Sequence, residues 1–146
     1  MHNEHRTRID SFPEINVTRW DLGRLDHLLG GHSPGRPSRV IEFLVRKLMA
    51  ANVMRDADIP PLTVTMGSRV EYHGDEEAQG STATVVHPND LDFYDDAISI
   101  LSPIGAVLLG LSEGQSMTYT ESTGGPRTIT VRKVLYQPEA SQRARA

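Results

Sequence analysis

The sequence contains no cysteine, which excludes disulfide bonds, thiolate metal sites and a cysteine nucleophile. This fits a reducing compartment. No apolar run approaches the roughly 20 residues that a transmembrane helix needs. The N-terminal residues 1–6 also lack the apolar core of a signal peptide. We therefore expect a cytoplasmic protein that makes no contact with a membrane.

Positive charge is scarce in the C-terminal part of the chain. The 146 residues carry a formal net charge of −4, which predicts no direct specific binding to nucleic acid. Residues 1–60 hold nine Lys/Arg and eight Asp/Glu, whereas residues 61–138 hold four and ten. The second stretch would therefore attract a basic partner surface.

The N-terminal part predicts a polar tail followed by two helices. Residues 1–14 are polar and irregular, which predicts a flexible tail. Thr18 to Asp21 resembles a capping box, and leucines at helical spacing follow until Gly30-Gly31. A second apolar stripe predicts a helix over residues 37–54. The two helices form a short, coiled-coil-like antiparallel hairpin over residues 15–58.

After Pro60-Pro61 the pattern changes from helical to strand-like. Strands are expected over residues 62–66, 69–73, 81–87, 97–101, 115–120 and 127–136. Before the last two strands, Ser102 is placed to cap a short helix that has Pro103 at its first position and ends at Gly110.

The predicted fold class is α+β. It consists of the helical hairpin followed, over residues 59–138, by a strongly bent antiparallel sheet of about five strands with one short helix. Residues 139–146 are expected to form a second flexible tail.

The sequence matches known motifs for catalysis and cofactor binding only in part. Gly30 to Pro37 has the spacing of a phosphate loop but lacks its Lys-Ser/Thr and follows a helix, so it reads as a helix–helix turn. The acidic stretch 88–96 lacks the glycine and closing glutamate of a calcium loop. It reads as a solvated loop in which Phe93 and Tyr94 would serve as anchors for a basic partner. The histidines show no metal-ligand spacing, and no catalytic set emerges, so we predict neither metal nor cofactor.

The corner formed by Ser102, Pro103 and Ile104 has two interpretations. It is either a helix start tucked under the core or an exposed contact surface. A helix start points its free N–H groups outward, where they suit a polar or acidic partner group.

Several ordered motifs resemble those of a known family. The second part of the chain resembles the C-terminal domain of the Gre transcript-cleavage factors, and a closer resemblance is to their relatives, the regulator of nucleoside diphosphate kinase family. The motifs are Val64-Thr65-Met66-Gly67-Ser68-Arg69-Val70, Ile98-Ser99-Ile100-Leu101-Ser102-Pro103-Ile104-Gly105, Ala106-Val107-Leu108-Leu109-Gly110-Leu111, Glu113-Gly114 and Tyr136-Gln137-Pro138-Glu139-Ala140. Together with the short N-terminal helices, the resemblance covers roughly residues 15–140.

The resemblance implies an FKBP-like C-terminal domain that docks on RNA polymerase, at the rim helices of the β′ subunit beside the secondary channel. The contact residues would be Leu101, Ser102, Pro103 and Ile104. Gre factors often carry Asp or another residue where Leu101 stands.

The hairpin departs from the Gre pattern. Gre factors carry a long coiled coil whose acidic tip helps to hold a catalytic metal. Here the hairpin is short, and its tip, with His32, Arg36 and Arg39, has no acidic residue. The resemblance therefore favours a transcription regulator that is not an enzyme, stimulates no transcript cleavage and competes with Gre factors.

Two other functions stay open. An FKBP-like fold suggests a prolyl isomerase, but that activity needs a deep aromatic-lined pocket, and the chain has only three Phe, one Trp and four Tyr. The family name suggests an adaptor that affects nucleoside diphosphate kinase levels.

Overall fold

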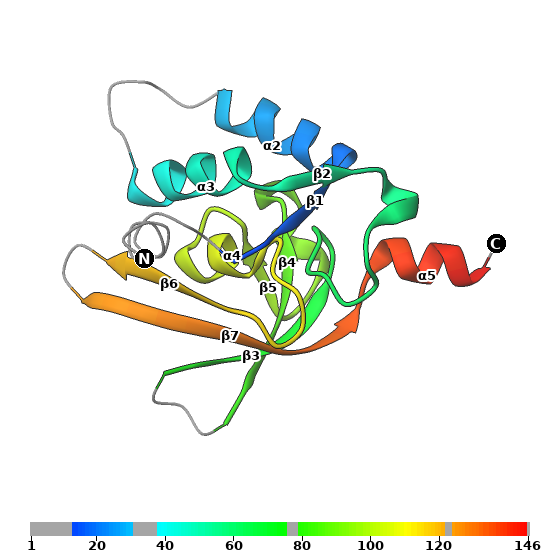
Figure 1. Ribbon diagram of the computed structural model, residues 1–146. Coiled ribbons are helices and arrows are strands. Elements are labelled where there is room, and N and C mark those ends of the chain that lie inside the picture. Colours follow the sequence, from blue (N-terminus) through cyan, green and yellow to red (C-terminus); the bar gives the residue numbers. More distant parts are fainter. Residues whose placement is uncertain (1–12, 31–37, 76–78, 122–123, 146) are drawn as a thin grey trace, which may run out of the picture.

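The computed structural model describes residues 13–30, 38–75, 79–121 and 124–145 (Figure 1). The helices are α2 (Arg19–Gly30), α3 (Arg39–Met49), α4 (Pro103–Leu108) and α5 (Pro138–Arg145), with 3₁₀ turns η1 (Asp56–Asp58) and η2 (Pro88–Phe93). The strands are β1 (Asn16–Thr18), β2 (Asn52–Met54), β3 (Arg69–Gly74), β4 (Ser81–Val86), β5 (Ala97–Ser99), β6 (Ser116–Glu121) and β7 (Gly125–Tyr136).

The main sheet has five strands in the order β5-β4-β3-β7-β6. All neighbours are antiparallel except β4 and β5, which run parallel. Register shifts between Arg69 and Val70 and between Glu71 and Tyr72 bend β3 against the long strand β7. The sheet therefore curls, and α4 packs against four of its strands, β4 to β7.

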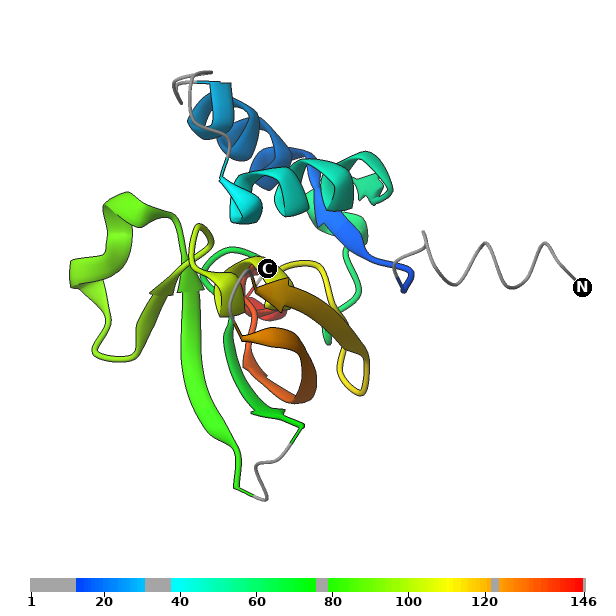
Figure 2. The same cartoon turned by 90° about the vertical axis from the view of Figure 1, so that its left-hand side faces the viewer.

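The helical hairpin lies on the body, on the side of α4 (Figures 1 and 2). Figure 2 shows α2 and α3 at one end of the molecule, with β3 and β4 extending away from them. Both helices begin at side-chain caps, of which the one at Thr18 was predicted. The Asp21 N–H donates to Thr18 Oγ1 over 3.0 Å, and the Ser38 hydroxyl accepts from the N–H groups of Val40 and Ile41.

Two buried ionisable side chains join the hairpin to the body. Lys47 of α3, 1% exposed, donates from Nζ to the carbonyl oxygens of Ala106 at 2.8 Å and Val107 at 2.6 Å. Asp21 of α2, 2% exposed, accepts the backbone N–H of Met66 over 3.0 Å. Because charged groups are rarely buried without partners, these bonds mark where each helix is fixed. In the predicted capping box, Asp21 would bond back to its own helix instead.

The second helix is shorter than predicted. It ends at Met49 rather than near Met54, because the chain turns and forms β2. This strand pairs in parallel with β1, where Asn52 lies opposite Asn16. A pairing between segments so far apart in the chain leaves no local signal, whereas the apolar stripe before it continued to favour a helix.

Residues 62–66 form no regular strand, contrary to the prediction. Thr63 makes a single bridge to Ser112, after which the chain turns. The Ser68 hydroxyl accepts the N–H of Thr65 over 2.9 Å inside that turn. Side-chain bonding of this kind competes with a strand ladder.

A flexible tail was predicted for residues 139–146. That prediction is wrong for the described residues, because 138–145 form the helix α5. Arg143 donates to the carbonyl oxygens of Asp56 and Ile59 at 2.9 and 3.0 Å, and the Thr65 hydroxyl donates to Glu139 over 2.7 Å. These contacts stabilise a helix that has little apolar surface. The predicted N-terminal tail lies outside the described residues except for its last two positions.

Asp21 makes the stability of the fold depend on pH. Burial raises the pKa of its carboxyl to about 7 from the ordinary 3.8, opposed by the hydrogen bond from Met66. Between these pH values the folded chain holds a proton that the unfolded chain has released. The free energy of unfolding therefore falls as pH rises through this interval.

Asp21→Asn keeps an acceptor for the Met66 N–H and removes this titration. We expect its stability relative to the wild type to increase from pH 4 to pH 7, by on the order of 4 kcal/mol at most. Urea unfolding at constant ionic strength measures the effect. Asp26→Asn, an exposed change on the same helix, is the control. If the free energy of unfolding changes with pH in the same way for the wild type and Asp21→Asn, Asp21 is not the source of the pH dependence.

Candidate partner-binding site

Ser102 fixes the corner between β5 and α4. Its hydroxyl donates to the carbonyl oxygen of Ser99 over 2.6 Å and accepts the N–H of Gly105 over 3.2 Å. The Ser102 backbone N–H also donates to Ser99, over 2.9 Å. Pro103 occupies the first helical turn, where its missing N–H leaves no bond unmade. The predicted cap and helix start are therefore confirmed.

Gly105 allows α4 to lie directly on the preceding strand. A Cβ at this position would clash with the carbonyl oxygen of Ser99, so only glycine fits the close backbone approach. The helix then buries Ala106, Val107 and Leu108 completely. At its end Gly110 adopts a φ of 90°, which turns the chain toward Val64.

The four residues predicted to contact a partner, Leu101 to Ile104, are all half-buried. The structure thus combines the two interpretations of the corner, since Leu101 and Ile104 pack against the core and all four residues keep part of their surface outside. Pro103 and Ile104 line a small apolar indentation together with Tyr119. The Phe43 ring of α3 contacts the Tyr119 ring edge-to-face, with centroids 5.2 Å apart. The hairpin therefore packs against a residue that lines this indentation.

The acidic stretch after β4 is more ordered than predicted. It contains η2, and two of its carboxylates are engaged in the fold. Asp96 accepts from Arg69 over 3.0 Å and from the Thr84 hydroxyl over 2.8 Å, while Asp90 pairs with Arg24 over 3.3 Å. Phe93 is 74% exposed and Tyr94 46% exposed, so both rings are open to a partner.

The predicted hairpin tip is only partly described. Arg39 is the exposed first residue of α3. His32 and Arg36 lie outside the described residues. The site therefore rests on the corner at α4 and on the exposed rings of the neighbouring loop.

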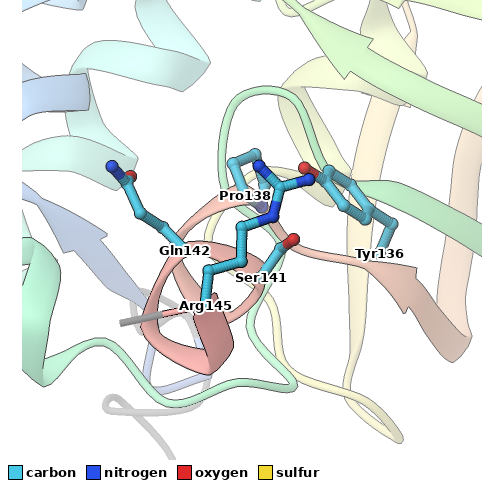
Figure 3. Close-up of a pocket in the computed structure, with 5 residues that line it drawn as sticks. All are labelled: Tyr136, Pro138, Ser141, Gln142 and Arg145. Carbon is cyan, nitrogen blue, oxygen red and sulfur yellow. The ribbon is translucent and has the colours of Figure 1, made fainter.

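A separate groove of about 490 Å³ lies at the C-terminal end of the chain (Figure 3). Its side chains come from the end of β7 and from α5, as Figure 3 shows, and are Tyr136, Pro138, Ser141, Gln142 and Arg145. These five include neither a carboxylate nor an imidazole, the usual general acids and bases. The groove is a surface feature without evident catalytic chemistry.

Within the described ranges, no three His, Asp or Glu side chains are grouped to hold a metal ion. No helix in the same part of the chain has both the length and the apolar character needed to cross a bilayer.

Comparison with known proteins identifies the family. Residues 60–136, which include the corner, match the family described as transcription elongation factor, GreA/GreB, C-terminal. The chain belongs to the GreA/GreB family. The resemblance expected from the motifs is thereby confirmed.

Relatives of similar length support the assignment. The "Regulator of nucleoside diphosphate kinase" of Escherichia coli strain K12 is 32% identical over 133 residues, covering 90% of this chain and 96% of its own. A protein of the same name from Shigella flexneri gives the same values. A solved structure, "Prokaryotic transcription elongation factor GreA/GreB from Nitrosomonas europaea", is 34% identical with a TM-score of 0.65. That match covers 86% of this chain and all of the other, so the likeness extends beyond the C-terminal domain.

The Ser102 cap is expected to stabilise the whole corner. Ser102→Ala removes the acceptor for the Gly105 N–H, so the free energy of unfolding should fall by about 1 kcal/mol. Ser102→Thr keeps the hydroxyl and should stay near the wild type. Urea unfolding of both variants measures the difference. Equal losses in the two variants would assign the effect to packing rather than to the cap.

Proposed function

We propose that this protein regulates transcription by binding RNA polymerase near its secondary channel, on the β′ rim helices, without stimulating transcript cleavage. The observation that carries the proposal is the corner at Ser102, which is braced by two hydrogen bonds and lies within the matched family region. The proposed contact residues are Leu101, Ser102, Pro103 and Ile104. Such a protein would act in the cytoplasm and compete with Gre factors.

The dimensions of the hairpin support the absence of cleavage. α2 has 12 residues and α3 has 11. At 1.5 Å per residue they extend only about 18 Å and 17 Å. Lys47 and Asp21 hold both helices to the body, and the sequence from residue 31 to 39 contains no Asp or Glu. A hairpin of this kind supplies no acidic tip to a distant active centre.

We also propose that the body, residues 59–138, is an FKBP-like unit and that the hairpin, residues 15–58, is an appendage to it. The curled sheet with α4 packed inside supports this description. The indentation beside α4 has a single aromatic lining residue, Tyr119, which gives little support to the alternative of prolyl isomerase activity. The name of the Escherichia coli relative keeps an adaptor that affects nucleoside diphosphate kinase levels as a second alternative.

Polymerase binding is tested with Pro103→Ala combined with Ile104→Ala. These changes shorten two corner side chains and leave the Ser102 cap in place. We expect purified core RNA polymerase to bind the variant at least about tenfold more weakly, because interface anchors contribute over 1 kcal/mol each. Leu135→Ala, at a 47% exposed position on β7, is the matched control. A wild-type protein that fails to bind polymerase would overturn the proposal. Unchanged binding of the double variant would show that the corner is not the contact surface.

The second test uses a backtracked elongation complex. Added protein should release no RNA beyond what polymerase cleaves alone, because the short hairpin brings no carboxylates. Increasing amounts should suppress the cleavage that a Gre factor stimulates. RNA gel electrophoresis measures both. Stimulated cleavage would contradict the first expectation, and undiminished Gre-dependent cleavage at saturating protein would contradict a shared site.

A further inference from the structure

The outward face of α2 carries an unusual set of side chains. Trp20, the single tryptophan of the chain, is 66% exposed. Residues three or four apart lie together on a helix, so Trp20 lies near Gly23 and Arg24, and Gly23 lies near Arg19 and His27. The exposed Trp20 ring leaves a large apolar area in water that is available to a ligand.

A groove of about 410 Å³ separates this face from the segment that follows β4. The α2 side chains form one wall, and His87 and Asn89 form the other. The volume lies within the range of about 300–1,000 Å³ that is typical of small-molecule sites.

The groove presents donors suited to an anion. Arg24 pairs with Asp90 over 3.3 Å, but both side chains are about one-third exposed, so the pair is weak and its exchange for another anion costs little. Arg19 lies in the same wall. His87 Nδ1 accepts the N–H of Asn89 over 3.1 Å, which assigns the proton of a neutral ring to Nε2. Burial, assisted by Arg24, lowers the pKa of His87 and favours that neutral ring.

Gly23 is an independent indication that this space is used. A glycine inside a helix costs about 1 kcal/mol relative to alanine. At Gly23 a Cβ would meet no atom within 4 Å, and the backbone needs no positive φ. Neither packing nor conformation therefore requires glycine here. Its effect is to leave the groove wall open between the Trp20 ring and the arginines.

We infer that this groove binds a free nucleotide, with the base stacked on Trp20 and the phosphates on Arg19 and Arg24. A planar ring beside two guanidinium groups matches a ligand that combines an aromatic base with phosphate oxygens. A longer nucleic acid is disfavoured by the net charge of −4. This inference is independent of polymerase binding.

Trp20 fluorescence reports on the site directly, since no other tryptophan contributes. The full chain is titrated with ADP and ATP, and N-acetyltryptophanamide corrects for absorption by the nucleotides. We expect saturable quenching, with affinity at least about tenfold higher than for adenosine, which lacks phosphate, or tripolyphosphate, which lacks a base. A short single-stranded RNA is titrated in the same way as the last ligand. Quenching by RNA alone, or by none of these ligands, would overturn the inference.

Two matched substitutions locate the site. Gly23→Leu fills the groove wall, and leucine favours a helix more than glycine does, so the change should not weaken α2. Gly30→Leu makes the same change at the end of α2, where the added Cβ also meets nothing within 4 Å. We expect Gly23→Leu to weaken ADP binding by about tenfold or more and Gly30→Leu to leave it unchanged. Arg24→Gln should weaken ADP more than adenosine. Equal affinity of Gly23→Leu and the wild type would overturn the inference.

Discussion

The two hydrogen bonds of Lys47 are the contact on which the arrangement of this protein depends. A short helix such as α4 leaves carbonyl groups near its end without intrahelical partners, and burial makes unpaired carbonyls costly. Lys47 Nζ satisfies two of them, on Ala106 and Val107, from a different part of the chain. Burial lowers the pKa of Lys47 well below its usual value, and its Nζ donates to both acceptors. One side chain thus completes α4 and fixes α3 to it.

The position of the corner follows from that attachment. Gly105 sets α4 against the end of β5, Ser102 closes the turn between them, and Lys47 secures the other end of the helix. A surface held at both ends loses little freedom when it binds, so more of the contact energy remains for the complex. The proposed function needs such a preorganised surface and no reactive group. This agrees with the roles of Asp21 and Lys47, whose buried side chains bond to backbone groups.

The sequence predicted the features that short-range chemistry determines. The Thr18 and Ser102 caps and the Gly110 stop depend on a few adjacent residues, and the structure has each of them. Features set by distant contacts were missed. A lysine in an amphipathic helix gives no sign that it will be buried, because its partners are 59 and 60 residues away. The pairing of β1 with β2 and the docking of α5 likewise depend on contacts across the fold. The motifs predicted the corner because it is local, while the Trp20 groove joins two remote segments.

The docking of α3 on the body also explains why one face of α2 stays exposed. α3 turns Phe43, Leu44 and Lys47 toward the body, whereas α2 buries only Asp21 and Leu25. In a long projecting coiled coil, each helix covers the other along a continuous apolar seam. Here the leucine side of α2 is used for packing, and the opposite face is left to Trp20 and its arginines. Because the hairpin lies on the body, it extends less far than a projecting coiled coil would, and the face of α2 that carries Trp20 stays exposed beside η2.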